Sequence, residues 1–149
     1  MTWFECKISY EKVAENGLTK KVTETYLVDA LSFTEAEARI IEEMKPFITG
    51  EFTVAGIKRA GYSELFFCDE DAADRWFKCK LLFITLDEKS GAERKKAIHM
   101  LVQACDTTDA DKKLKENMKG SMSDYQIASV SETNIMDVFP YKSKSDEHS

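Results

Sequence analysis

The sequence contains no run of apolar residues long enough to cross a lipid bilayer, so we expect no membrane-spanning helix. The N-terminal segment lacks the basic stretch followed by an apolar stretch that is typical of a secretory signal peptide. The four cysteines form no Cys-x-x-Cys pair and lie far apart, at Cys6, Cys68, Cys79 and Cys105. We therefore expect reduced cysteines, no metal site and a cytoplasmic protein.

Motifs of the common enzyme classes are also missing. The sequence has no phosphate-binding loop of the Walker type, no dinucleotide-binding glycine fingerprint and no Gly-x-Ser-x-Gly nucleophile elbow. His148 lies in the polar C-terminal stretch, and the other histidine, His99, has no recognisable nucleophile partner. Acidic residues cluster where helices are expected to begin, a position that the helix dipole favours. We expect neither enzymatic activity nor a cofactor.

The composition is typical of a globular protein. The 149 residues are 43% hydrophobic and 32% charged, and the formal net charge is −6. This acidic balance argues against a general nucleic-acid-binding protein but is compatible with a local basic patch. A chain of this length forms one domain or two small ones and can bury about two thirds of its unfolded surface. Each half alone would be marginally stable, so we expect the halves to share a core or to pack tightly.

The most informative feature that is present is a pattern that occurs twice in the same order. The repeated motifs are Trp3-Phe4-x-Cys6-Lys7 with Trp76-Phe77-x-Cys79-Lys80, Leu27-Val28-x-Ala30 with Leu101-Val102-x-Ala104, and Glu42-x-Met44-Lys45 with Glu116-x-Met118-Lys119. The conserved order of the motifs indicates a tandem duplication. It predicts two copies of one small unit, arranged about a pseudo-two-fold axis.

Each copy is expected to read strand, hairpin, strand, helix, strand, with a short apolar segment at its end. In the first copy, residues 3–10 alternate between apolar and polar, as in a half-buried strand. Asn16-Gly17 favours a tight turn because both residues tolerate positive φ, and residues 21–28 form the second strand. Ser32 and Glu35 fit a capping box at the start of the helix.

The same signals continue through the rest of the chain. The third strand begins near Phe52, and residues 64–67 are expected to close the first unit. In the second copy, Lys89-Ser90-Gly91 forms the turn and Asp106 caps the helix. Residues 137–139 are expected to close the second unit. Cys6 and Cys79 occupy equivalent inner positions, which we interpret as small buried residues in preference to a metal or redox pair.

These elements predict an α+β fold with antiparallel sheets and one helix per copy. We assign residues 1–68 to the first β-β-α-β repeat, with a final short strand, and residues 76–140 to the second. Residues 69–75 form an acidic linker, and residues 141–149 a disordered polar tail. The two copies could join edge to edge or exchange strands, and the sequence does not choose between these arrangements.

Three stretches together resemble a known family: Trp3 to Lys7, Lys20 to Arg39, and Ile135 to Lys142. They are similar to small uncharacterised proteins of Bacteroides-type gut bacteria that are also found in phages and mobile elements. The resemblance extends over nearly the whole chain, and the family is a domain of unknown function. It implies a source of this kind, but it implies no activity and no site residues.

Tryptophan and lysine recur together in the two copies. Strand alternation places Trp3 and Lys7 on one sheet face, and Trp76, Lys78 and Lys80 on the equivalent face. The hairpin partner strands add further cations, so the candidate binding residues are Trp3, Lys7, Lys21, Trp76, Lys78, Lys80, Arg94 and Lys95. Aromatic rings that stack on bases, with cations near the phosphates, are typical of single-stranded nucleic-acid binding. In the more common alternative, each tryptophan covers the core edge or the interface between the halves, and the lysines are solvated.

Two functional hypotheses follow. The first is a non-enzymatic binding or adaptor protein, with a protein partner or a small anionic ligand in a pseudo-symmetric site. The second is a single-stranded nucleic-acid-binding protein that uses the tryptophan and lysine face. Exposure of Trp3 and Trp76 distinguishes them, because buried indole rings cannot stack on bases. Exposed strand edges would permit dimerisation, but the sequence does not define the oligomeric state.

Overall fold

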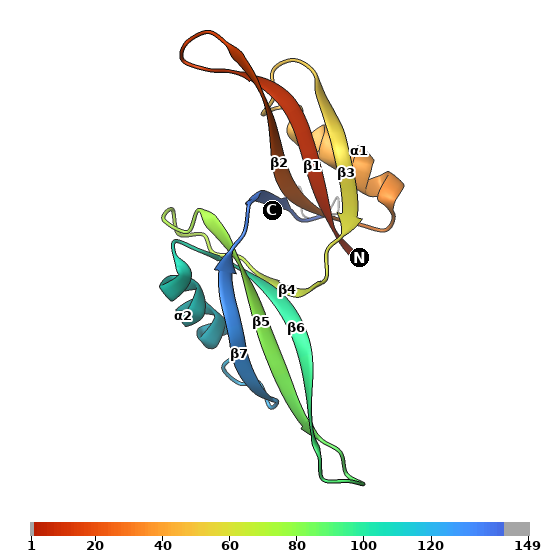
Figure 1. Cartoon of the computed structure of the whole chain (residues 1–149), viewed down its shortest axis with the longest axis vertical. Helices are drawn as coiled ribbons and strands as arrows, with labels where there is room; N and C mark the ends of the chain where they lie inside the picture. Colours follow the sequence, from red (N-terminus) through yellow and green to blue (C-terminus); the bar gives the residue numbers. More distant parts are fainter. Residues whose placement is uncertain (1, 142–149) are drawn as a thin grey trace, which may run out of the picture. The chain divides into compact units, whose positions relative to one another are not determined.

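A computed structural model describes residues 2–141, which form eight β-strands and two α-helices (Figure 1). The chain divides into two compact units. Among the described residues, unit 1 contains residues 2–60 and 134–141, and unit 2 contains Gly61–Thr133. Each unit has a four-stranded sheet and one helix, which confirms the expected α+β class.

The elements of unit 1 are β1 (Thr2–Val13), β2 (Thr19–Ala30), α1 (Phe33–Met44), β3 (Phe52–Arg59) and β8 (Ile135–Phe139). Its strand order is β3-β1-β2-β8. The elements of unit 2 are β4 (Tyr62–Phe66), β5 (Arg75–Leu86), β6 (Glu93–Ala104), α2 (Thr107–Asn117) and β7 (Asp124–Glu132). Its strand order is β4-β6-β5-β7. Neither helix in residues 2–141 is long and apolar enough to cross a membrane.

The sheets are mixed, so the prediction of purely antiparallel sheets was wrong. β8 runs parallel to β2, with Val138 opposite Leu27, and β4 runs parallel to β6, with Leu65 opposite Leu101. We had expected each short final segment to close its own copy. Instead, each one pairs with the sheet of the other copy. The connections Ala60–Gly61 and Thr133–Asn134 carry the chain from one unit into the other. A strand that arrives from outside a sheet is not constrained by a hairpin, so it can run parallel to its neighbour.

Each unit has its own core between its helix and one face of its sheet. The buried core of unit 1 consists of Phe4, Cys6, Ile8, Tyr26, Val28, Ala30, Ala36, Ile40, Met44 and Ile48. The buried core of unit 2 consists of Phe77, Cys79, Leu81, Met100, Val102, Ala104, Ala110 and Leu114. The predicted alternation in the first strand of each copy is confirmed over part of its length, because alternate residues lie in the buried cores: Phe4, Cys6 and Ile8 in β1, and Phe77, Cys79 and Leu81 in β5. The intervening residues lie on the opposite face, which carries the lysines discussed below.

The local turn and cap signals are also present. The Ser32 hydroxyl accepts a hydrogen bond from the Glu35 amide at 3.1 Å, and the Asp106 carboxylate accepts one from the Asp109 amide at 2.7 Å. In the first hairpin only Gly17 has a positive φ, at 82°, so Asn16 does not use its tolerance of that region. Of the expected polar tail, residues 141–149, only Tyr141 is described, and its amide donates to the Asp29 carboxylate; residues 142–149 lie outside the described residues.

Candidate functional site

The two tryptophans differ in exposure. Trp76 is only 2% exposed, and Phe67 packs edge-on against it with a centroid distance of 5.3 Å. The backbone N–H and the hydroxyl of Thr133 both donate to the Trp76 carbonyl at 2.9 Å. Trp3 is half-buried. Trp76 therefore has no free ring face on which a base could stack, and its position agrees with the structural interpretation of this residue.

Two lysines stand on the face of unit 2 that points away from α2. Lys78 and Lys80 alternate along β5 with the core residues and are exposed. Strand pairing places Lys80 between His99 on β6 and Ser129 on β7. In the next row along the same face, Lys78 lies opposite Ser131 on β7. Each lysine thus has a serine as its cross-strand neighbour on the exposed face.

Lys95 belongs to this face, but Arg94 does not. Lys95 pairs with Ile84, which has the same parity on β5 as Lys78 and Lys80. Arg94 pairs with Thr85, on the opposite face, and forms an ion pair with Asp87 at 3.1 Å. The backbone N–H of Lys89 and the Arg94 guanidinium lower the pKa of Asp87 below its ordinary value.

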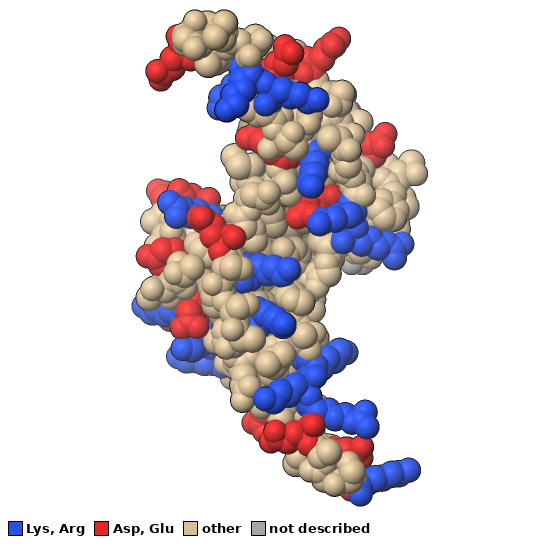
Figure 2. Space-filling model, viewed as in Figure 1, with Lys and Arg blue, Asp and Glu red and all other residues tan. Residues whose placement is uncertain are grey.

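Carboxylates stand on this face only toward its hairpin end among the described residues, where Glu93 pairs with Leu86 and Asp124 with Ile84. No carboxylate of the described residues lies within ion-pair distance of Lys78, Lys80 or Lys95. Half-buried His99 is sensitive to these cations: burial lowers its pKa, and the charges of Lys78 and Lys80 lower it further. In Figure 2, blue side chains stand among uncharged residues over the unit that contains β5 and β6. We call Lys78, Lys80, Lys95, His99, Ser129 and Ser131 the basic face.

The corresponding face of unit 1 carries both signs of charge. Lys7 is exposed, but its neighbour on the same face, Glu5, forms an ion pair with Lys58 at 3.0 Å. In the sequence repeat, Glu5 stands where unit 2 has Lys78, and Thr25 stands where unit 2 has His99. The duplicated motif therefore does not produce the same electrostatic surface twice.

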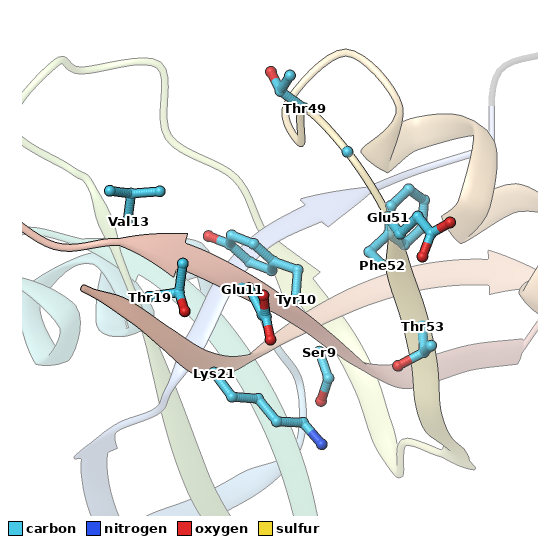
Figure 3. Close-up of a pocket in the computed structure, with 11 residues that line it drawn as sticks. Ser9, Tyr10, Glu11, Val13, Thr19, Lys21, Thr49, Glu51, Phe52 and Thr53 are labelled. Carbon is cyan, nitrogen blue, oxygen red and sulfur yellow. The ribbon is translucent and has the colours of Figure 1, made fainter. Parts of the chain in front are cut away.

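Lys21 lies in a different setting, a pocket of about 650 Å³ formed by β1, β2 and the start of β3 (Figure 3). Its walls also carry the carboxylates of Glu11 and Glu51, so Lys21 is not part of a uniformly cationic surface. The hydroxyl of Ser9, on the same wall, is already paired with that of Thr23 at 3.0 Å. The pocket has a mixed charge and points to no single class of ligand.

The two repeated cysteines, Cys6 and Cys79, are core residues. Cys6 and Cys79 are fully buried, and burial raises the pKa of the Cys6 thiol to about 12 and that of Cys79 to about 11. Both thiols therefore stay protonated at neutral pH and act as small core residues. Within residues 2–141, no group of three or more His, Cys, Asp or Glu side chains is placed to hold a metal ion.

Sequence reasoning missed the neighbours of the two lysines. The sequence shows no recognisable partner for His99, but the hairpin register places it directly opposite Lys80. The turn at Lys89-Ser90-Gly91 contained that information, because the turn position sets the register of a hairpin. Ser129 and Ser131 had no such signal. Their pairing with β5 includes an irregularity between Lys80 and Leu81, which a local pattern does not reveal.

These features define an α+β protein with two mixed four-stranded sheets, one of which carries an exposed basic face. The chain belongs to the family DUF4494, a domain of unknown function, whose sequence profile matches residues 2–141. This agrees with the resemblance seen in the sequence. No curated protein matches the chain significantly.

Proposed function

We propose that the protein is a non-enzymatic binding protein that takes an anionic ligand on the basic face of unit 2. The observation that carries this proposal is the grouping of Lys78, Lys80 and His99 without a carboxylate partner among the described residues. Like charges on neighbouring positions repel one another, and a bound anion removes that repulsion. A sheet face with a purely structural role does not need neighbouring like charges, whereas a surface that binds an anion does.

The spacing of the groups supports an extended anion. Lys78 and Lys80 are alternate residues of one strand, so their backbones lie about 7 Å apart along β5. Cross-strand neighbours in an antiparallel pair are about 4.5–5.5 Å apart, which places one serine hydroxyl beside each lysine. An anionic group at either row would receive a charge-assisted hydrogen bond from the lysine and a second one from the hydroxyl. The face thus offers two anion-binding positions, one after the other along β5.

A second candidate function is the binding of single-stranded nucleic acid at the same face. The repeated lysine and serine rows favour it, because a polynucleotide presents phosphates at regular intervals. Trp76 is buried and contributes no stacking, so this version relies on phosphate contacts alone. A folded anionic protein partner would also be attracted by charge, but the linear rows favour a flexible chain of phosphates or a small phosphorylated ligand.

We also infer that the two units derive from a tandem duplication followed by an exchange of final strands. The shared motifs and the common order of strand, strand, helix, strand, strand support this inference. The pseudo-two-fold arrangement stays a prediction. The resemblance further supports a role in a Bacteroides-type bacterium or one of its phages or mobile elements, and the scattered, unpaired cysteines support a location in the cytoplasm.

Binding to simple anions tests the proposed function directly. We expect fluorescently labelled oligothymidine, a cyclic dinucleotide or pyrophosphate to bind at low salt, and the affinity to fall as salt is added. If oligothymidine is the ligand and two or three lysines contact phosphates, log K against log salt should have a slope of about −1.4 to −2.1. Anisotropy with the labelled oligonucleotide and calorimetry with the small anions provide the measurement.

The Lys7→Ala variant is the matched control for this titration, because Lys7 occupies the position in unit 1 that Lys80 occupies in unit 2. Its affinity should equal that of the wild type, whereas Lys80→Ala should bind several-fold more weakly. An acidic peptide serves as the comparison ligand for a protein partner. Absence of binding by every anion at low salt, or binding that is indifferent to salt, would rule out the proposal.

A further inference from the structure

The last described strand, β8, docks onto unit 1 through residues of unit 1 alone. Ile135 and Val138 are 6% and 5% exposed. The ring of Phe139 stacks on Tyr26, with centroids 5.8 Å apart, and lies 6.5 Å from the ring of Phe47. The backbone pairs in parallel with Thr25–Val28 of β2. The edge of β2 is therefore an acceptor site for a strand with this apolar pattern.

Two charged residues, Asp29 and Arg39, hold the end of β8 and the residues that follow it; we call this pair the clasp. The Asp29 carboxylate accepts hydrogen bonds from Arg39 Nη1 at 2.9 Å and from the Tyr141 amide at 2.5 Å. Arg39 Nη2 donates to the carbonyls of Phe139 and Pro140 at 3.4 and 3.3 Å. The side chains of Arg39 and Asp29 are only 16% and 17% exposed. Hydrogen bonds between ionised groups at such low exposure are stronger than neutral ones, so the clasp contributes substantially to holding the strand.

Unit 2 holds β4 with a related set of contacts. The Cys68 amide, which follows β4, donates to the Gln103 side chain at 2.8 Å. Lys113 of α2 forms an ion pair with Glu70 at 3.3 Å. However, β4 follows unit 1 in the chain and is itself followed by β5, which belongs to the same sheet as β4. Its downstream connection therefore stays within unit 2. β8 is joined to unit 2 only through Thr133–Asn134, so it is the strand that can be released with least rearrangement.

We propose that β8 of a second copy can occupy the acceptor edge of β2, giving a dimer by reciprocal strand exchange. Every contact described above is the same whichever chain supplies β8. The free energies of monomer and dimer then differ only through the Thr133–Asn134 connection and the protein concentration. Only Thr133 and Asn134 join β7 to β8, and short connections of this kind invite exchange of the segment that follows them. The proposal does not depend on the proposed function, but a dimer would carry two basic faces and could bind a long polyanion bivalently.

The test uses the full chain in unlabelled and ¹⁵N-labelled forms. After each form is concentrated to the millimolar range, the two are mixed and their masses are followed by native mass spectrometry. We expect a dimer whose fraction rises with concentration, and dimers of intermediate mass that appear slowly after mixing. A chain that stays monomeric at every concentration, including after refolding when concentrated, would overturn the proposal.

Three variants separate strand exchange from other modes of dimerisation. A short Gly-Ser insertion between Thr133 and Asn134 should shift the equilibrium to the monomer. The same insertion in the Asn16–Gly17 turn, which joins two strands of one unit, should leave it unchanged. Arg39→Gln weakens the docking of β8 equally in both states, so it should speed exchange by on the order of tenfold without changing the dimer fraction. A dimer fraction that ignores the Thr133–Asn134 insertion would show that dimers form through another surface.

Discussion

Replacing Lys78 and Lys80 together by glutamate should lower the affinity for anions by at least about 100-fold. A charge-assisted hydrogen bond contributes about 1.5–3 kcal/mol, and each 1.4 kcal/mol corresponds to a factor of ten. The double variant loses two such bonds and places two repulsive carboxylates at the same rows. Both lysines are exposed and lack ion pairs with the described residues, so the free energy of unfolding should change by only about 0.5 kcal/mol. Anisotropy titration and chemical unfolding of the same samples measure the two quantities.

The control for this experiment is the double variant Lys7→Glu with Lys21→Glu in unit 1. It carries the same net charge as the first variant but leaves the basic face intact. We expect it to retain binding within about threefold, because Lys7 and Lys21 belong to unit 1 and not to the basic face. Equal losses in the two variants would show that net charge, and not this face, governs binding.

Phe77→Ala should lower the free energy of unfolding by about 3–5 kcal/mol. Phe77 is 1% exposed and lies at the centre of the unit 2 core, so its removal loses apolar contacts and leaves a cavity beneath α2. Urea unfolding followed by circular dichroism measures the change. Leu86→Ala in the same strand is the comparison: Leu86 is 68% exposed, and its replacement should cost no more than about 0.5 kcal/mol. A cost below about 1 kcal/mol for Phe77→Ala would contradict the assignment of this core.

Features that depend on neighbours in the sequence could be predicted, and features that depend on distant pairing could not. Ser32 and Asp106 were identified as helix caps because their partners lie three residues ahead in the chain. The shared face of Lys78 and Lys80 followed from strand alternation alone. The parallel pairing of Val138 with Leu27 has no local signal, since the two residues are brought together only by the fold.

The candidate site shows the same division. Arg94 and Lys95 are adjacent in sequence and equally cationic, but only the hairpin register reveals that they occupy opposite faces. Phe67, the residue after β4, packs against the buried indole ring of Trp76. Strand alternation does not reveal this contact, and by itself it placed Trp76 on the same face as the exposed lysines. The ion pair of Glu5 with Lys58, which reduces the basic character of the unit 1 face, likewise links two separate strands.

The pKa of His99, measured with and without a bound anion, tests the central claim most directly. In the free protein, burial and the charges of Lys78 and Lys80 hold this pKa below its ordinary value. An anion bound between the lysines offsets their repulsion and therefore raises the pKa. By linkage, the affinity for the anion should then increase as the pH falls through the pKa of His99.

The measurement is an NMR titration of the His99 imidazole, assigned with a His99→Asn variant, in which His148 supplies the other histidine signal of the sequence. We expect a low pKa in the free protein, a higher one when the ligand is saturating, and a higher one without ligand in the Lys78→Ala, Lys80→Ala double variant. A His99 pKa that stays the same while an anion is demonstrably bound would place the binding site elsewhere on the protein.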